Sequence, residues 1–293
     1  MRPLSHALSR KEPSGAGAYP IVATDVIDIA EIRSPRDLPA HPNRPERRSR
    51  DVTTALLLAA GAGRRLGNGS PKCLAGVSGV PILGRLVSSL VEQGFERLVV
   101  VVGYRGEQIR DYLKVHASGL EIHYIDSRRY ATTNNIYSLW LARDYIEAPF
   151  VLIESDLVFD PRLLGLMSVS DRIAVGKLLP HMHGTTVSID DAGIVELFRV
   201  GGLDGPRLSY KTVNMYSLSM SIWHEVTRRL DLRIAAGRVH DYYESVFADM
   251  AVEGLLPLEA VNFDSGRWSE IDSPDDLVAA QQLFYDPPST IGA

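Results

Sequence analysis

The most constraining feature of this sequence is a short apolar segment that runs directly into a glycine-rich loop. Residues 54–60 read TALLLAA, and the loop that follows extends from Gly61 to Lys72. A short, almost wholly apolar run of this kind predicts a buried strand of a parallel sheet. Glycines let a backbone approach a ligand closely, and their amide groups can point at anionic oxygens. Arg64, Arg65 and Lys72 add positive charge, so the loop suits a triphosphate.

The segments after this loop alternate between helical and extended patterns. Helices are predicted at 81–93, 107–115 and 134–145, and strands at 98–102, 120–125 and 150–153. Strands that alternate with helices across short loops form βαβ units with a parallel sheet. Ligands of such sheets lie beyond the carboxyl ends of the strands. We therefore expect an α/β fold of Rossmann-like type, with a mixed, mainly parallel sheet flanked by helices.

The pattern becomes mixed after residue 160, which indicates a smaller inserted region. Short strands are predicted at 173–177, 185–189, 194–199, 256–261 and 267–271, and helices at 222–236 and 240–253. A last helix is predicted from Ser273. Its start shows a capping box, because Pro274 occupies the first turn and Asp276 lies three residues after Ser273.

Other phosphate-binding loops fit the glycine-rich segment less well. A dinucleotide-binding turn opens straight into a helix, but Gly69-Ser70-Pro71 blocks an immediate helix here. A P-loop needs Gly-Lys followed by Ser or Thr, which this loop lacks. A glycine-rich turn with solvated basic residues and no ligand is the remaining alternative.

The run from Leu58 to Leu66, followed by Pro71-Lys72, resembles the signature of nucleotidyltransferases that activate sugar phosphates and related small phosphates. The resemblance extends from Thr54 to about Gln282. It implies that the loop wraps the nucleotide phosphates and that Arg65 and Lys72 have catalytic roles, stabilising the transferred charge. It also implies a nucleotide-binding set that consists of Ala59, Ala60, Gly61, Ala62, Gly63, Gly103, Asn134 and Ser155.

Two aspartates at predicted strand ends are candidate metal ligands. Asp156 follows the strand at 150–153, and Asp272 follows the strand at 267–271. A pair of carboxylates is a hard-oxygen site suited to Mg²⁺, which also bridges to substrate phosphates. The resembled family binds its metal with an aspartate from each of these places. For Asp272 the alternative is a helix-capping carboxylate. Sugar-phosphate members usually have glycine where this chain has Ser155.

Two further strings point to the second substrate. Residues 134–138 read NNIYS and residues 211–216 read KTVNMY. Both are similar to strings in cytidylyltransferases that act on phosphocholine, 2-aminoethylphosphonate and related acceptors. That subgroup must hold a cationic amine, which aromatic faces and carboxylates can do. Asp241 and Tyr243 are further candidates for holding this amine. The expected acceptor-binding residues are Asn135, Lys211, Asn214, Tyr242, Glu244 and Trp268.

Charge and composition limit the remaining possibilities. The chain has 293 residues, a formal net charge of −5 and one cysteine, Cys73, which excludes a disulfide scaffold and a multi-cysteine zinc site. The first 50 residues carry 9 Lys+Arg, 6 Asp+Glu and 7 of the 17 prolines. We expect residues 1–50 to be a flexible extension or docked arm and residues 51–293 to form the catalytic domain. No apolar run reaches the ~18 residues of a membrane helix, and the acidic balance disfavours nucleic acid as a partner.

The sequence therefore predicts a cytoplasmic, Mg²⁺-dependent cytidylyltransferase. It would transfer CMP from CTP to a small phosphate or phosphonate, either phosphocholine or 2-aminoethylphosphonate, and release pyrophosphate. The acceptor oxygen is already ionised at pH 7, so no general base is needed. Alternatives are a sugar- or inositol-1-phosphate nucleotidyltransferase and a catalytically silent, nucleotide-sensing regulator. The sequence is compatible with a homodimer but does not establish the oligomeric state.

Overall fold

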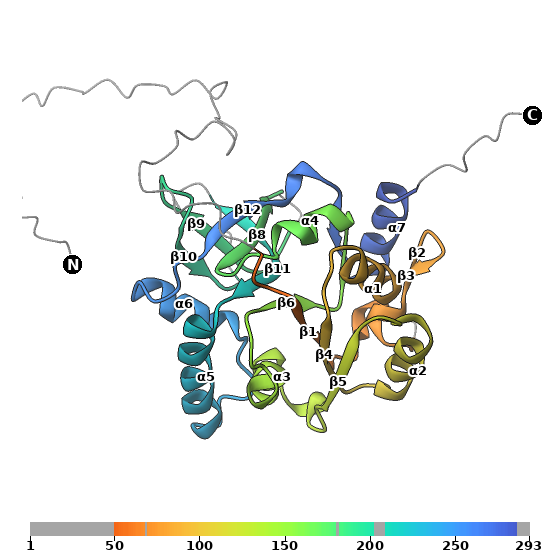
Figure 1. The fold of residues 1–293 in the computed structure, drawn as a ribbon, viewed down its shortest axis with the longest axis horizontal. Coiled ribbons are helices and arrows are strands. Elements are labelled where there is room, and N and C mark those ends of the chain that lie inside the picture. The colour runs from red at the N-terminus through yellow and green to blue at the C-terminus, as the bar shows by residue number, and fades with distance from the viewer. Residues whose placement is uncertain (1–49, 68, 180–181, 202–208, 286–293) are drawn as a thin grey trace, which may run out of the picture. The chain divides into compact units, whose positions relative to one another are not determined.

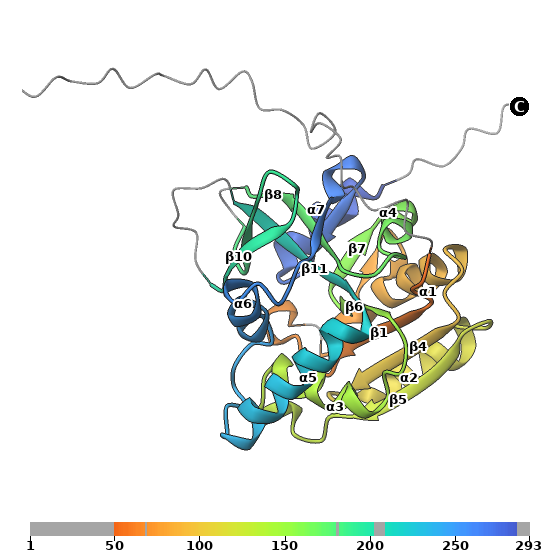
Figure 2. The same ribbon diagram turned by 60° about the vertical axis from the view of Figure 1, so that its left-hand side comes forward.

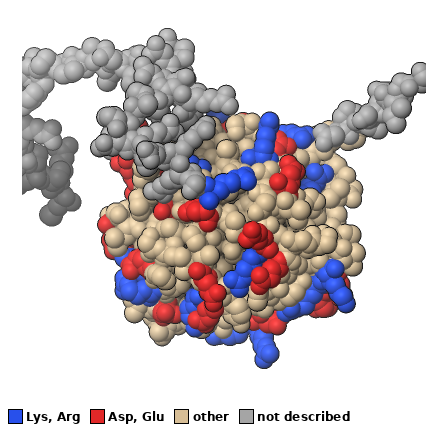
Figure 3. Space-filling view, in the orientation of Figure 1, with Lys and Arg blue, Asp and Glu red and all other residues tan. Residues whose placement is uncertain are grey.

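The computed structural model describes residues 50–67, 69–179, 182–201 and 209–285. The predicted extension therefore lies almost entirely outside the described residues, and its boundary near residue 50 stays a prediction. Among the helices that the structure describes, none combines the length and the apolar character needed to cross a membrane. Acidic and basic side chains are interspersed on the face of the described region that Figure 3 shows.

Four parallel strands form the centre of the fold. They are ordered β6–β1–β4–β5, and their bounds are Phe150–Glu154, Thr54–Ala59, Arg97–Val102 and Glu121–Asp126. The neighbours β1 and β4, β1 and β6, and β4 and β5 all pair in parallel. On the other edge of β6, the long strand β11 (Tyr210–Leu218) runs antiparallel. The sheet is thus mixed with a parallel centre, as the sequence predicts.

Helices cover both faces of this centre, because both faces of β1 are apolar. Ala55 and Leu57 point to a core shared with α1 (Ile82–Glu92), α2 (Gly106–His116) and α4 (Pro161–Leu166). Leu56 and Leu58 point to a second core, shared with α3 (Asn135–Leu141), α5 (Met220–Ala235) and α6 (Glu244–Val252). Figures 1 and 2 show α1 and α2 on one side of the central strands and α3 and α5 on the other.

The inserted region extends the same sheet beyond β11. Strand β11 pairs with β8 (Arg172–Lys177) and with β9 (Thr186–Ile189), which in turn pairs with β10 (Val195–Arg199). Strand β12 (Glu259–Asn262) adds to β8 in parallel. The register of β11 against β8 shifts between Thr212 and Tyr216. Asn214 lies inside this shift with a φ of 55°, a left-handed conformation that Asn tolerates better than most residues.

A two-stranded ribbon brings a late segment of the chain, Trp268–Glu270, back beside the end of β6. Strand β13 (Trp268–Glu270) pairs antiparallel with β7 (Leu157–Phe159), which follows β6 directly. The Ile271 amide then donates to the Asp156 carbonyl at 3.0 Å. Helix α7 (Pro274–Leu283) follows, and β2 (Gly76–Val77) and β3 (Val80–Pro81) form a hairpin before α1. This return places Asp272 beside Asp156, although the two residues are distant in the sequence.

The predicted elements differ from the observed ones at a few places with physical causes. Helix α7 starts with the predicted capping box. The helix predicted at 240–253 begins only at Glu244, and the helix predicted at 134–145 ends at Leu141 and continues as a 3₁₀ turn. Strand β11 was not predicted as a strand, because the buried polar residues Lys211, Thr212 and Ser217 hide its apolar signal.

Candidate active site

The glycine-rich loop adopts the backbone that its glycines permit. Gly63 has a φ of 55°, and a Cβ atom there would lie 3.0 Å from the Cβ of Lys72. Gly103, at the end of β4, approaches β1 so closely that a Cβ would lie 2.6 Å from the Ala60 carbonyl oxygen. The loop forms two 3₁₀ turns, Arg64–Leu66 and Lys72–Leu74, and among the described residues no α-helix begins between Gly61 and α1. The loop therefore does not open straight into a helix, as Gly69-Ser70-Pro71 predicts.

A cavity of about 360 Å³ lies against this loop. The hydroxyl of Tyr104 donates to the Gly69 carbonyl at 3.3 Å and ties the loop to the end of β4. The cavity is lined by Ala62, Gly63, Arg64, Gly67, Gly69, Tyr104, Tyr130 and Ala131. Two predicted nucleotide-binding residues, Ala62 and Gly63, thus line this cavity. Three others, Ala59, Ala60 and Gly61, connect the end of β1 to the loop.

The four charged residues singled out in the sequence meet at one point beside the loop. The Nζ atom of Lys72 lies 2.7 Å from Asp156 Oδ2 and 2.5 Å from Asp272 Oδ1. An Arg65 guanidinium nitrogen lies 2.8 Å from the same Asp272 oxygen. The side chains of Lys72 and Asp156 are each 12% exposed, whereas that of Arg65 is 74% exposed. The loop and the two strand ends therefore form one compact ionic cluster.

The pairing in this cluster favours the charged forms of Lys72 and Asp272. Burial alone would lower the pKa of Lys72, but Asp156 and Asp272 outweigh it and the pKa is raised. Burial would likewise raise the pKa of Asp272, but Lys72 and Arg65 hold it below its ordinary value. Both groups are therefore ionised at neutral pH, which is what a site for anionic phosphates and a cation requires.

The carboxylates of this cluster fit a divalent cation. Asp156, Glu270 and Asp272 each offer an oxygen, and these oxygens lie within 4.8 Å of one another. The second oxygen of Asp156, Oδ1, is buried and has no hydrogen-bond partner in the described part of the chain. A buried carboxylate oxygen without a partner is unfavourable unless a cation or donor satisfies it. The sequence alone did not single out Glu270 as a ligand, although this residue stands two positions before Asp272.

A second group of acidic side chains lies on the β6 and α6 side of the cluster. The Asn135 amide nitrogen donates to Glu154 Oε1 at 3.2 Å and to Glu244 Oε2 at 3.3 Å. The Asn135 amide oxygen accepts from the Tyr243 backbone amide at 3.0 Å. The predicted residues Asn135 and Glu244 therefore meet, and Glu154, the last residue of β6, joins them without having been predicted. We call Asn135, Glu154 and Glu244 the acidic pocket.

Lys211 and Asn214 connect the two groups through Glu270. Lys211 is only 2% exposed, and its Nζ atom lies 3.0 Å from Glu270 Oε2 and 2.8 Å from the Thr212 carbonyl oxygen. The Asn214 amide donates to the other Glu270 oxygen at 3.2 Å. Lys211, which the sequence offered as an acceptor contact, is thus a buried, paired group whose partner also belongs to the carboxylate triad.

The electrostatics of the acidic pocket differ from those of the ionic cluster. Burial raises the pKa of Glu244 to about 7, although Asn135 and Lys211 oppose this rise. Burial and the charge of Glu244 hold the pKa of Glu154 well above its ordinary value. No lysine or arginine among the described residues forms an ion pair with either carboxylate, since Lys211 pairs with Glu270. These two carboxyl groups therefore keep a proton more readily than exposed carboxylates do.

The remaining predicted residues lie around these groups. Asn134 caps α3, and its side chain accepts from the Asn135 amide and donates to the His240 carbonyl. Trp268 packs over Gly176, the register partner of Lys211, and its indole donates to Asp264. Tyr242 is 53% exposed, and Asp241 is paired with Arg233 and Arg238. Ser155 separates Glu154 from Asp156. Ligand contacts of these residues stay predictions.

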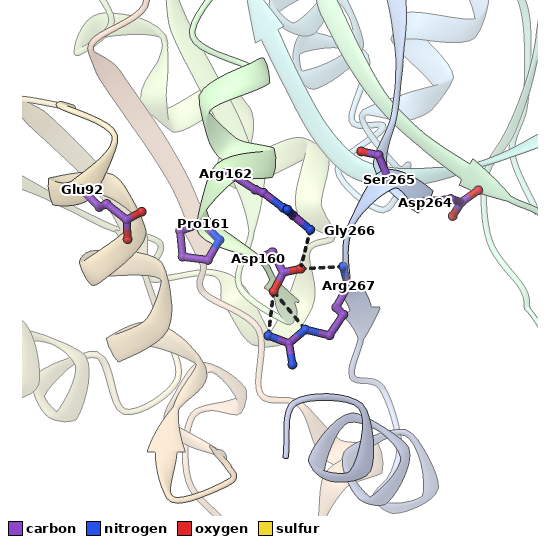
Figure 4. A pocket seen from close by; sticks show the side chains of 8 residues that line it. All are labelled: Glu92, Asp160, Pro161, Arg162, Asp264, Ser265, Gly266 and Arg267. Carbon is purple, nitrogen blue, oxygen red and sulfur yellow. Dashed lines mark hydrogen bonds and ion pairs between the residues drawn. The ribbon is translucent and has the colours of Figure 1, made fainter. Parts of the chain in front are cut away.

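A larger cavity, of about 680 Å³, lies elsewhere, at the start of α4 and before β13. Figure 4 shows that Asp160 is held there by the backbone amide and guanidinium of Arg267 and by Arg162. These pairings lower the pKa of Asp160 despite its partial burial. None of the predicted site residues lines this cavity, and Asp160 is paired there with Arg162 and Arg267, so we place the candidate active site at the ionic cluster.

Comparisons with known proteins agree with this geometry. Residues 55–167 match the MobA-like NTP transferase domain family. The chain is 31% identical over 248 residues to CMP-5'-(3-aminopropyl)phosphonate synthase of Streptomyces rubellomurinus, with 80% of this chain and 39% of that protein covered. It is 29% identical to 2-aminoethylphosphonate cytidylyltransferase of Lancefieldella rimae, with 78% of this chain and 92% of that protein covered. The chain thus spans about two fifths of the length of the Streptomyces protein.

A solved structure supports the same fold. CTP:phosphocholine cytidylyltransferase from Streptococcus pneumoniae superimposes with a TM-score of 0.66 at 19% identity, covering 80% of this chain and 100% of that one. At this identity the likeness speaks for the fold alone. The sequence relatives named above are cytidylyltransferase-type enzymes by their names, and the domain match covers the loop, the central strands and Asp156. Residues 55–167 are therefore similar to a MobA-like NTP transferase domain, and the sequence relatives named above are nucleotidyltransferases.

Proposed function

We propose that this protein is a Mg²⁺-dependent cytidylyltransferase that transfers CMP from CTP to a small phosphonate or phosphate acceptor. The observation that carries the proposal is the convergence of Arg65, Lys72, Asp156 and Asp272 beside the glycine-rich loop. A structural ion-pair network has no need of an adjoining loop of backbone amides and a cavity. The names of the two sequence relatives support CTP as donor and an aminoalkylphosphonate as acceptor.

The chemistry follows from the charges in the site. An ionised acceptor oxygen attacks the α-phosphorus of CTP, the new P–O bond forms, and the bond to the β-phosphate oxygen breaks. Pyrophosphate leaves with that bonding pair, and no proton has to be moved. Lys72 and Arg65 lie where they can neutralise charge on the phosphates, and the loop amides can hold them in position.

The carboxylate triad would hold the metal ion in this reaction. Asp156 and Asp272 are the two predicted ligands, and Glu270 lies close enough to act as a third or through water. Carboxylate oxygens are the ligands that Mg²⁺ prefers. When bound, the ion would supply neutralisation of phosphate charge.

A pyrophosphate-release assay tests the proposal. The full chain is incubated with Mg²⁺, each of the common nucleoside triphosphates and a panel of acceptors: 2-aminoethylphosphonate, phosphocholine, glucose 1-phosphate and inositol 1-phosphate. We expect release with CTP and with one of the first two acceptors. Release with sugar or inositol phosphates only would contradict the acceptor class. Absence of release with every pair would favour a nucleotide-sensing regulator.

A further inference from the structure

We propose that four exposed arginines, Arg64, Arg105, Arg128 and Arg129, form an electropositive rim that attracts the nucleoside triphosphate from solution. We call these residues the arginine rim, and we call the cavity of about 360 Å³ beside the glycine-rich loop the nucleotide cavity. This inference rests on the proposed function, because it assigns the route by which the nucleotide of that reaction enters. It gives the rim a role in the association rate and none in the transfer of CMP.

The rim differs from most arginines of the described region in having no carboxylate partner. Most of those arginines form an ion pair, as Arg110 does with Asp126 at 2.6 Å. The four guanidinium groups of the rim form no ion pair and no hydrogen bond with a described residue, and all four residues are exposed. An arginine side chain is always charged in proteins, and its N–H donors match phosphate oxygens. The rim therefore carries positive charge that no carboxylate neutralises.

The rim adjoins the nucleotide cavity. Arg64 lines this cavity, as do Tyr104 and Tyr130. Arg105 directly follows Tyr104, after the end of β4. Arg129 directly precedes Tyr130, after the end of β5. The rings of Tyr104 and Tyr130 meet edge to face, with their centroids 6.2 Å apart. The charges that follow the two strands are therefore neighbours of the same aromatic wall of the cavity.

Backbone hydrogen bonds join the three loops that carry the rim. The Tyr104 amide donates to the Ala60 carbonyl at 3.0 Å, which joins the segment after β4 to the start of the glycine-rich loop. The Ser127 amide donates to the Val102 carbonyl at 2.8 Å, which joins the segment after β5 to the end of β4. All three loops therefore leave the sheet at the carboxyl ends of its parallel strands, where ligands of such sheets lie.

Aromatic rings hold two charges of the rim without neutralising them. The guanidinium carbon of Arg105 lies 5.5 Å from the centre of the Tyr104 ring. The guanidinium carbon of Arg129 lies 5.1 Å from the centre of the Tyr137 ring. A cation over an aromatic face is attracted by the quadrupole of the ring. Because the ring has no net charge, the guanidinium keeps its positive charge and its N–H donors for an anion that approaches the cavity.

The cations of the ionic cluster do not supply the same attraction at a distance. Lys72 lies 2.7 Å from an Asp156 oxygen, and Arg65 lies 2.8 Å from an Asp272 oxygen, so a carboxylate balances each of these charges. The chain as a whole has a formal net charge of −5, which repels a triphosphate. A local positive patch focuses anions on one place and raises association rates by about ten- to a thousandfold. The rim is therefore the part of the site that attracts the nucleotide before contact.

Association kinetics without an acceptor test the inference, because no CMP is then transferred. A ribose-labelled fluorescent CTP and Mg²⁺ are mixed with the full chain in a stopped-flow instrument, and displacement by unlabelled CTP gives the dissociation rate. At an ionic strength of about 0.02 M, we expect Arg105→Gln/Arg129→Gln to lower the association rate about tenfold and to change the dissociation rate less than about twofold. At about 0.5 M the association rates of the two proteins should agree within about twofold, since salt screens the rim.

Further variants show whether charge is the cause. Arg105→Lys/Arg129→Lys keeps both charges without the planar guanidinium groups, and it should associate within about twofold of the wild type. Arg105→Gln alone should lower the association rate about threefold at low salt. Its matched control is Arg162→Gln, which removes the same charge from an exposed arginine of the larger cavity and should associate as the wild type does. A low rate in the lysine variant, or an equal loss in Arg162→Gln, would overturn the inference.

The kinetics also separate failure of the inference from failure of the proposed function. Equal association rates of the wild type and Arg105→Gln/Arg129→Gln at low salt would overturn the inference, while pyrophosphate release with CTP would still support the proposed function. If the rim variant loses its association rate but no acceptor yields pyrophosphate, only the transfer reaction is refuted. Absence of CTP binding to the wild type would overturn both.

Discussion

The two halves of the candidate site, the ionic cluster and the acidic pocket, differ in whether their carboxylates are paired with cations. In the ionic cluster, Lys72 and Arg65 pair with Asp156 and Asp272 at 2.5–2.8 Å, and every charge has an opposite partner. In the acidic pocket, Glu154 and Glu244 both accept from the Asn135 amide, and neither forms an ion pair with a lysine or arginine of the described part of the chain. The first half is therefore held together by opposite charges. In the second half, burial raises the pKa of both carboxyl groups, so a proton can take the place of a counter-ion.

The halves also differ in how the chain assembles them. The basic members of the cluster come from one loop of twelve residues, so they can be recognised as a contiguous string. The pocket draws one residue each from α3, β6 and α6, and only the fold brings these elements together. Variants that affect one half and spare the other therefore test whether the two halves have separate roles.

The largest effect is expected at Asp156, in the balanced half. Asp156→Asn should lower kcat by at least about a thousandfold with every acceptor, because metal-ion neutralisation of phosphate charge is worth several kcal/mol. The protein should stay folded, since Lys72 keeps Asp272 as a partner. Pyrophosphate release and thermal unfolding of the same sample measure both. Activity within tenfold of the wild type would refute the metal assignment.

A smaller and graded effect is expected for the two cations of the cluster. Lys72→Gln should lower kcat by about a hundred- to a thousandfold, the range found when one fixed donor to developing charge is removed. Arg65→Gln should cost only about tenfold, because its exposed guanidinium is screened by water. Steady-state rates at saturating CTP compare the two variants. A larger loss for Arg65 would reverse the assigned order of importance.

Glu270 should affect both halves. It belongs to the carboxylate triad, and its partner Lys211 acts electrostatically on Glu244. Glu270→Gln should therefore raise both the Mg²⁺ concentration for half-maximal rate and KM for the acceptor, each by about tenfold, as is typical for groups that support metal ligands. Titrations of Mg²⁺ and of acceptor measure the two constants separately. A change in only one of them would place Glu270 in one half alone.

The smallest effect is expected at the start of α7, which supports Asp272. Ser273→Ala removes the cap that accepts from the Asp276 amide and should lower the free energy of unfolding by about 1 kcal/mol. The Mg²⁺ requirement should rise slightly, because the same turn holds the Asp272 amide through Asp276. Asp275→Asn, the exposed neighbour on α7, is the control in chemical denaturation. A wild-type unfolding curve for Ser273→Ala would show that the cap is dispensable.

Much of the balanced half could be predicted from the sequence, because local patterns encode it. The apolar run before Gly61 predicts β1, the punctuation by Pro81 and Gly94 predicts α1, and the Ser273 capping box predicts the start of α7. Asp156 and Asp272 were recognisable because both follow predicted strands. The structure brings these residues together with Lys72 and Arg65, while their roles toward CTP and metal remain proposals.

The residues that were missed lay beside the predicted ones. Glu154 and Glu270 each stand two residues before a predicted metal ligand, and residues spaced by two lie on the same face of an extended chain. That spacing was the available signal. Strand β11 and the turn of Asn214 toward Glu270 were not accessible in this way, because they depend on a register shift against β8. Pairing between strands distant in the sequence leaves no local pattern.

The most direct test of the central claim is ³¹P NMR of CTP, Mg²⁺ and 2-aminoethylphosphonate incubated with the full-length protein. The account predicts a new pair of coupled resonances from a CMP–phosphonate anhydride, which appears together with pyrophosphate in equal amount. Pyrophosphate without the coupled pair, or neither product with this acceptor and with phosphocholine, would contradict the account.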